Sequence, residues 1–166
     1  MILGIILILI LLVIDQVSKY LIFFLMEENQ MIPVIHNFFY IASKRNFGAA
    51  WSMFYGRSVF LIIITIIALG FFIYLFKDVD FRKKRFYSYG VTLMIAGALG
   101  NFIDRLTGHG VIDFLKFIIF GYHFPVFNFA DMCLVVGVIL FAVDLIFYDT
   151  HNFFHERKDE IDKGSN

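Results

Sequence analysis

Three short runs decide the fold: Ala98-Leu-Gly-Asn-Phe-Ile-Asp-Arg105, Gly110-Val-Ile-Asp-Phe114 and Phe124-Pro-Val-Phe-Asn-Phe-Ala-Asp131. In each run, polar or charged side chains sit at the edge of an otherwise apolar segment. A carboxylate inside or beside membrane hydrocarbon is costly, needs partners and usually marks function. We therefore take Asp113 and Asp131 as the first candidates for a functional pair of carboxyl groups.

The composition indicates an integral membrane protein. The chain has 166 residues, which suits one domain, and 60% of them are hydrophobic while only 17% are charged. The formal net charge is zero, which argues against nucleic-acid binding because that requires a basic surface. The one cysteine, Cys133, excludes an intrachain disulfide and argues against a cysteine-ligated metal site.

Four apolar segments are long enough to cross a bilayer, which takes roughly 20 residues. They cover about residues 2–26, 59–76, 86–103 and 129–148, within a single domain, 1–166. A cleaved signal peptide is the alternative for the first segment. That segment lacks a basic start and a small-residue cleavage site, so we expect a retained helix.

The connection at residues 27–57 predicts a small β-rich element. Its part from Val34 to Ser43 is rich in β-forming and aromatic residues, which favours a short strand or hairpin near the membrane interface. The expected fold is an all-α membrane protein with four transmembrane helices and a small extracytoplasmic β-rich element between helices 1 and 2. Residues 104–127 read as a second mixed connection and residues 149–166 as a charged tail.

The distribution of basic residues predicts the orientation in the membrane. Eight lie in the short loop between spans 2 and 3 and in the tail, whereas five lie in the two mixed connections. Cytoplasmic loops carry the excess of lysine and arginine. We therefore expect both termini in the cytoplasm and the two mixed connections facing outward, together with Asp113 and with Asp131 at the start of the fourth span.

The end of the third span carries three polar residues on one predicted helix face. Asn101, Asp104 and Arg105 are spaced i, i+3, i+4, and Gly97 lies one turn earlier with room for a neighbouring helix. The simpler alternative is that Asp104 and Arg105 form an ion pair that caps the span.

The fourth span is predicted to begin after Pro125. Asn128 is a suitable N-cap and Asp131 then falls in the first turn, where the helix dipole favours an ionised carboxylate. Ordinary helix capping would explain both residues. Asp113, flanked by Ile112 and Phe114, is a second carboxylate that capping does not explain, and this favours a site.

Two further stretches carry polar residues. Asp15 and Lys19, at i, i+4 spacing in the first span, favour a self-neutralised pair over direct chemistry. In the small-residue loop from Asn46 to Ser52, Gly48 permits close backbone approach and Asn46 could bind an extended peptide. A zinc peptidase with a His-Glu-x-x-His pair and a serine hydrolase with Gly-x-Ser-x-Gly are not indicated, because both motifs are missing from the sequence.

Five motifs in this order resemble those of the lipoprotein signal peptidases, also called signal peptidase II. They are Asp15-Gln-Val-Ser-Lys19, Asn46-x-Gly-Ala-Ala-x-Ser52, Gly100-Asn-Phe-Ile-Asp-Arg105, Val111-Ile-Asp-Phe114 and Phe124-Pro-x-Phe-Asn-x-Ala-Asp131. The resemblance covers nearly the whole chain and includes the four spans. Phe47, Trp51 and Met132 are bulkier than expected for the family, which affects the predicted shape of the pocket and not its chemistry.

The resemblance implies an aspartyl intramembrane peptidase of the bacterial cytoplasmic membrane that needs no metal or cofactor. It would cut prolipoproteins before their lipid-modified cysteine and be inhibited by globomycin-type cyclic peptides. It places the catalytic pair at Asp113 and Asp131. It implies substrate-binding or supporting roles for Asp15, Lys19, Asn46, Gly48, Asn101, Asp104, Arg105 and Asn128.

The residues fit that chemistry, because two carboxyl groups about 3 Å apart share one proton. Asp131, near a helix N-terminus, is the better candidate for the ionised member, and Asp113, between apolar residues, for the protonated one. The 27–57 connection is expected to cover the site. The alternatives are a small proton- or cation-coupled transporter, which four spans without a repeat disfavour, and a non-catalytic assembly subunit.

Overall fold

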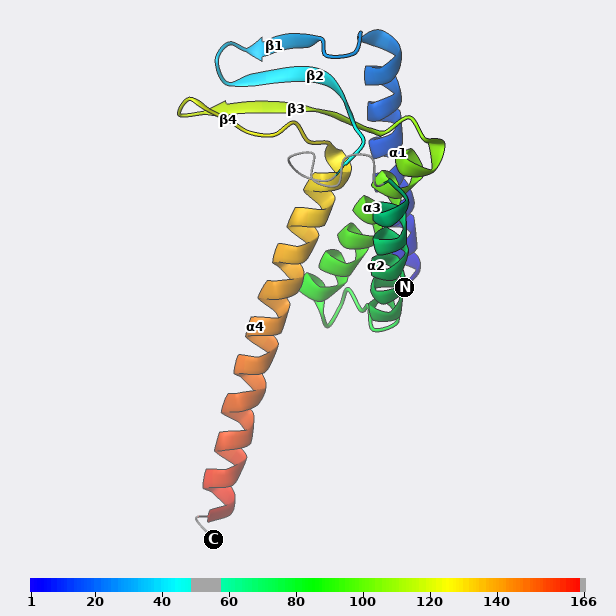
Figure 1. The fold of residues 1–166 in the computed structure, drawn as a ribbon. Coiled ribbons are helices and arrows are strands. Elements are labelled where there is room, and N and C mark those ends of the chain that lie inside the picture. The colour runs from blue at the N-terminus through cyan, green and yellow to red at the C-terminus, as the bar shows by residue number, and fades with distance from the viewer. Residues whose placement is uncertain (49–57, 165–166) are drawn as a thin grey trace.

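The computed structural model describes residues 1–48 and 58–164, in which long helices carry a four-stranded antiparallel sheet at one end (Figure 1). In chain order the elements are α1 (Ile2–Leu25), β1 (Met31–Ile35), β2 (Phe39–Asn46), α2 (Ser58–Phe76), α3 (Arg85–Thr107), β3 (Val111–Ile119), β4 (Tyr122–His123) and α4 (Phe129–Gly164).

All four predicted membrane-spanning helices are confirmed as helices long and apolar enough to cross a bilayer. α3 ends at Thr107, four residues beyond the predicted end of its span, so Asp104 and Arg105 lie on the helix. α4 continues well past its apolar part, Phe129–Phe147, and the charged tail is therefore helical as far as Gly164.

The central helix of the bundle is α3. In the apolar membrane-spanning part of α3, 67% of the residues are buried, whereas 11–17% are buried in the corresponding parts of α1, α2 and α4. A buried cluster of Val91, Met94 and Ile95 with Tyr87 and Val79 forms the core near one end of α3. The other helices pack around α3 and leave most of their apolar side chains for lipid.

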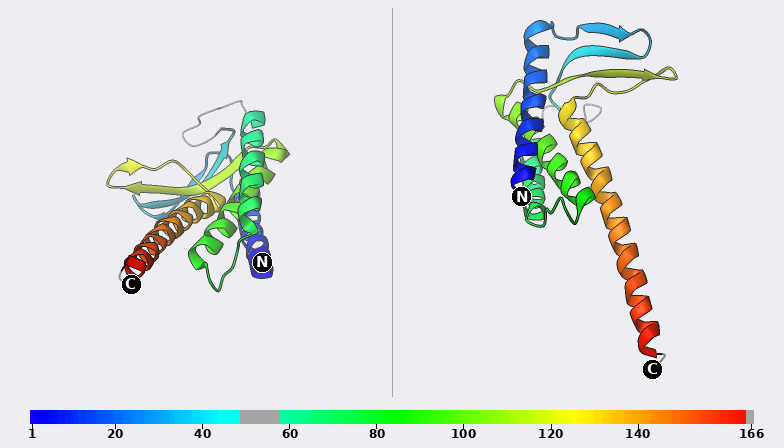
Figure 2. Two further views of the ribbon diagram at one scale, coloured as in Figure 1. Left: turned by 90° about the horizontal axis from the view of Figure 1, so that it is seen from below. Right: turned by 180° about the vertical axis from the view of Figure 1, so that it is seen from behind.

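Both termini lie at the same end of the bundle as the α2–α3 loop, and the sheet lies at the opposite end (Figures 1 and 2). An even number of spans requires this arrangement of the termini. It places the basic α2–α3 loop far from the sheet and from both mixed connections.

The sheet has the strand order β1-β2-β3-β4, and only its first half was predicted. The hairpin of β1 and β2 confirms the expected element between helices 1 and 2. β3 and β4, however, come from the connection between α3 and α4, so the fold is not all-α and the β element is not confined to one connection. Residues 111–114, the start of β3, are buried on both faces, and such a strand lacks the alternation of apolar and polar residues by which strands are recognised.

α3 and α4 approach each other closely at glycines. A Cβ atom on Gly90 would lie 2.9 Å from the Gly137 carbonyl oxygen, and one on Gly137 would lie 2.9 Å from the Gly90 carbonyl oxygen. Small residues allow this approach between membrane helices. Gly97 makes a third such approach, because a Cβ atom there would overlap the Ala130 carbonyl oxygen of α4, and it therefore provides the predicted room for a neighbouring helix.

Candidate active site

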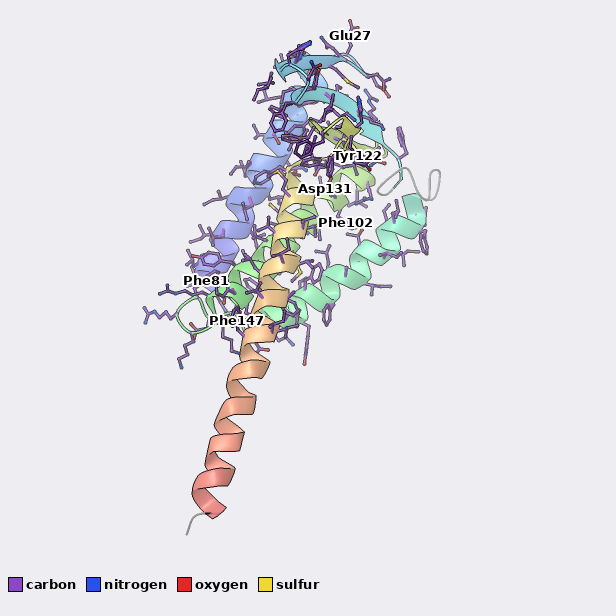
Figure 3. All side chains as sticks on the ribbon, turned by 90° about the vertical axis from the view of Figure 1, so that its left-hand side faces the viewer. Glu27, Phe81, Phe102, Tyr122, Asp131 and Phe147 are labelled. Carbon is purple, nitrogen blue, oxygen red and sulfur yellow. The ribbon has the colours of Figure 1, made fainter. Side chains whose placement is uncertain are left out.

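Asp113 and Asp131 line one cavity, of about 530 Å³, at the end of the bundle that carries the sheet. Asp113 lies on β3 and Asp131 in the first turn of α4, where Figure 3 labels it beneath the strands. The two predicted carboxyl groups, which lie on different secondary-structure elements, therefore reach the same cavity.

Asn128 joins the two aspartates. Its Nδ2 atom donates to Asp113 Oδ1 at 2.7 Å, and its Oδ1 atom accepts from the Asp131 backbone N–H at 3.0 Å. Asp131 Oδ2 in turn accepts from the Asn128 backbone N–H at 3.2 Å, which completes a reciprocal capping pair. The predicted N-cap is confirmed, and the same residue also holds the second carboxylate.

Two more amides fix the carboxylates from other elements. Asn46 at the end of β2 donates to Asp113 Oδ2 at 2.9 Å, and its own Oδ1 accepts from the Gly48 N–H at 2.9 Å. Asn101 on α3 donates to Asp131 Oδ1 at 2.7 Å. In this structure Asn46 therefore binds a carboxylate, while the loop residues 49–52 that complete its motif lie outside the described residues.

The environment of Asp113 favours its protonated form. Burial, and then the nearby charge of Asp131, raise the pKa of Asp113 to about 7, although the hydrogen bonds from Asn46 and Asn128 act in the opposite direction. A carboxyl group with such a pKa can carry a proton at neutral pH.

A buried cluster of charges lies behind the pair. Lys19 Nζ lies 2.8 Å from Asp15 Oδ2 and 2.8 Å from Asp104 Oδ2, and it donates to Asn101 Oδ1 at 3.0 Å. Its contact with Asp104 is an ion pair without hydrogen-bond alignment. Gln16 donates to both carboxylates at 3.1 Å. The predicted Asp15–Lys19 pair exists, and through Asn101 it also supports Asp131.

Asp15 also attaches α1 to the start of α4. Its Oδ1 atom accepts from the Ala130 backbone N–H at 2.9 Å, one residue before Asp131. Gly100 leaves room for this carboxylate, since a Cβ atom there would overlap Asp15 Oδ2. An anion at a helix N-terminus is stabilising. Asp15 thus helps to position Asp131 without lining the cavity itself.

Arg105 does not form the predicted alternative ion pair with Asp104 among the described residues. Its Nη1 donates to the Asn101 backbone carbonyl at 3.1 Å, and its guanidinium lines the same cavity as the two aspartates. Its buried Nε has no hydrogen-bond partner within residues 1–48 and 58–164. Asp104 instead belongs to the cluster around Lys19.

We expect Lys19→Met to destabilise the protein severely, because it leaves Asp15 and Asp104 buried without their common cation. Removing one partner of a buried ion pair costs about 3–5 kcal/mol. The thermal stability of the purified protein in detergent measures this loss. Asp104→Asn is the matched control: it leaves one carboxylate for one lysine, so its loss should be much smaller. Equal losses in the two variants would contradict the proposed charge balance.

Sequence reasoning missed several residues that the structure places around the site. Gln16 was quoted within a motif but was given no role, although a polar side chain in an apolar helix indicates a functional or buried position. Thr65 on α2 and Lys44 on β2 line the cavity and carried no signal of their own. The described residues hold no group of three or more potential metal ligands.

Comparison with known proteins agrees with this geometry. The family model described as signal peptidase (SPase) II matches residues 7–147. Lipoprotein signal peptidase of Staphylococcus aureus strain bovine RF122 / ET3-1 is 46% identical over 138 residues, 83% of each chain. That of strain JH9 is 46% identical over 139 residues, again 83% of each chain.

Two solved structures, both described as bacterial membrane enzymes determined by the in meso method, share the fold. The one at 2.3 Å resolution has a TM-score of 0.80 and 43% identity, and covers 90% of this chain and 90% of its own. The one at 1.9 Å has a TM-score of 0.75 and 42% identity, and covers 86% of this chain and 91% of its own.

Proposed function

The chain belongs to the signal peptidase II family, and we propose that Asp113 and Asp131 form the catalytic pair with which it removes signal peptides from prolipoproteins. The protein is a multi-pass membrane protease. The family match gives no support to the transporter alternative.

One observation carries the assignment of the pair. Asp113 and Asp131 line the same cavity and are hydrogen-bonded to the same residue, Asn128. Aspartates that only stabilised the fold would not need a shared partner beside a cavity. The cavity is also large enough to admit both a peptide segment and water.

The proposed chemistry assigns a separate task to each aspartate. Asp131, ionised at the N-terminus of α4, takes a proton from a water molecule whose oxygen adds to the scissile carbonyl carbon. Asp113 holds a proton and donates a hydrogen bond to the carbonyl oxygen. When the C–N bond breaks, a proton passes from the pair to the leaving amine, and the pair returns to its singly protonated state.

The walls of the cavity suit an amphiphilic substrate. Ile64, Ala68 and Phe72 of α2 face Leu134 and Val135 of α4 across it, and these apolar side chains would receive the signal segment. Asn46, Gly48 and Arg105 would hold the polar backbone around the cut. We propose that the cut falls before the lipid-modified cysteine and that the acyl chains remain in membrane lipid.

The same site is the proposed target of globomycin-type cyclic peptides, which would block the aspartates. We also propose that the end with the sheet faces outward and that both termini are cytoplasmic, since the basic α2–α3 loop lies at the end with the termini. The connection that contains Asn46 and Gly48 would then cover the site from the outer surface.

Cleavage of a lipid-modified precursor by the purified protein in vesicles, followed over a range of pH, tests this proposal. Because the pKa of Asp113 is raised, its proton is present below pH 7 and is lost as the pH rises through about 7. The cleavage rate should therefore fall on the alkaline side with a midpoint near 7. The thermal stability measured at each pH separates this from unfolding. No shortened product at any pH, or a rate that stays constant into alkaline solution, would contradict the proposal.

A further inference from the structure

The β3–β4 turn has an unusual sequence for its backbone conformation. Phe120 and Gly121 are the two residues between the strands, and both have positive φ, 50° and 78°. Two-residue hairpin turns with both φ values positive strongly favour Asn-Gly, Asp-Gly or Gly-Gly. A bulky residue with positive φ is a genuine outlier. Phe120 therefore occupies a position at which an ordinary turn residue would cost less free energy.

Phe120 gains no burial against the residues that the structure describes in return for this strain. Its exposed fraction, 105%, is the largest among the exposed large apolar residues of the described chain. An aromatic ring that is both strained in its backbone and fully exposed to water would be doubly unfavourable in solution. Strain of this kind persists where it serves a function.

The residues around the turn extend the apolar surface. Tyr122 and Phe124 are 55% and 41% exposed, and their rings meet edge to face at 5.1 Å. Ile119, at the end of β3, is also exposed. The run from Ile119 to Phe124 contains no acidic side chain, so its entry into lipid would require no desolvation of a carboxylate.

The position of the β3–β4 hairpin indicates that its exposed apolar side chains contact membrane lipid. The hairpin projects sideways beyond α4 in Figure 1 and in the right-hand view of Figure 2, beside the end of the bundle at which the apolar span of α4 begins. Residues two apart on a strand share a face, so Leu115, Phe117 and Ile119 lie on the face of β3 that carries Asp113. Asp113 points to the cavity between the helices. The apolar face of β3 beyond Asp113 is thus on the side of the sheet toward the membrane-spanning helices.

We propose that the β3–β4 turn is a membrane anchor, in which Phe120, flanked by Tyr122 and Phe124, inserts into the interfacial layer of the lipid bilayer on the side of the sheet. Aromatic residues are enriched at this depth. Since the same strand carries Asp113, the anchor also fixes the height of that carboxyl group relative to the bilayer surface. The proposal concerns lipid binding and does not depend on the assignment of the catalytic pair.

Depth-dependent quenching tests the anchor. Phe120→Cys and His36→Cys are each made in a Cys133→Ala background, labelled with an environment-sensitive nitrobenzoxadiazole dye and reconstituted in vesicles containing brominated phosphatidylcholine. His36 is the control, because it is exposed in the turn between β1 and β2 and β1 is the opposite edge of the sheet from β4. Only labelled variants that still cleave a precursor are compared.

We expect brominated lipid to quench the fluorescence of the dye strongly at position 120 and only a little at position 36. The degree of quenching at each position should not depend on the protein-to-lipid ratio. Equal quenching at the two positions, or none at position 120, would overturn the proposal. Quenching at position 120 that changes with the density of protein would also overturn it, since the partner would then be a second copy of the chain.

Phe120→Asn provides a second test with two opposite effects. Asparagine suits the turn, so this variant should melt at a higher temperature in detergent than the parent. In vesicles, a dye attached at Tyr122→Cys should be quenched less when residue 120 is Asn than when it is Phe. A lower melting temperature, or unchanged quenching at position 122, would contradict the anchor.

Discussion

Gly97→Ala is expected to abolish most of the activity and much of the stability. The added Cβ atom would overlap the Ala130 backbone oxygen and lie 2.9 Å from the Leu134 side chain. The backbone oxygen cannot move without the first turn of α4, which carries Asp131 one residue further on. α3 and α4 must therefore separate at the point where Asn101 and Asp131 meet.

The size of this effect follows from two contributions. Overpacking a close interface costs about 1–3 kcal/mol, and more where backbone atoms must move. A displacement of roughly 1 Å at a catalytic group can reduce a rate by about 10²-fold. We therefore expect a lower melting temperature together with a loss of cleavage of about 10²-fold or more, both measured on the protein purified in detergent.

Gly70→Ala is the matched control. Gly70 also lies within a membrane-spanning helix, α2, but a Cβ atom there would meet nothing within 4 Å among the described residues. Replacing a glycine inside a helix by alanine favours the helix by about 0.5–1 kcal/mol. Gly70→Ala should thus be neutral or slightly stabilising. If the two alanine variants behaved alike, the close contact of α3 with α4 would not be what positions Asp131.

The helices were predictable because each needs only a run of apolar residues of sufficient length. Which helix lies at the centre was not predictable from hydropathy. The membrane-spanning part of α3 has the lowest mean hydropathy of the four candidate spans, 1.3, and yet it is the most buried. Gly97, with its room for a neighbouring helix, was the better indicator, since burial between membrane helices depends on close packing and not on an apolar driving force.

Strands β3 and β4 were not predicted, because β3 is defined by its pairing with β2, which is distant in the sequence. β3 is recognisable as a strand only beside β2, with which it pairs from Phe39↔Phe117 to Asn46↔Val111. This pairing joins connections separated by two membrane spans, and hydrophobic periodicity within one segment contains no information about it. The motif around Asp113 was recognised, but the strand that carries it was not.

The residues of the candidate site were predicted from the sequence, but only some of the contacts between them were. Short-range relations, such as the cap at Asn128, follow from spacing and are confirmed. The bond from the Ala130 N–H to Asp15 spans 115 residues and no local pattern predicts it. The simpler alternative paired Asp104 with its neighbour Arg105, although adjacent side chains on a helix point in different directions. Lys19 is its partner instead.

Loss of either carboxyl group of the pair is the second large effect that we expect. Asp113→Asn and Asp131→Asn keep the size of the side chain but remove the group that holds or accepts a proton. General acid–base catalysis contributes about 10²–10⁴-fold to a rate, and each variant should lose at least that factor. Asp78→Asn is the control, because it changes an exposed carboxylate in the loop at the other end of the bundle.

The two aspartates should also act as one unit. Once one carboxyl group has been removed, the other has no partner with which to share the proton, so the second substitution has little left to remove. Losses from residues that act together are far from additive. The double variant should then be about as slow as the slower single variant.

The catalytic pair is tested most directly by the single-turnover rate of cleavage of a lipid-modified precursor, measured for the parent, Asp113→Asn, Asp131→Asn and the double variant in the same vesicles. We predict that none of the three variants cleaves at a rate near the parent's, and that the double variant is about as slow as the slower single variant. A single variant that cleaves at a rate close to the parent's, while remaining folded, would contradict the catalytic pair.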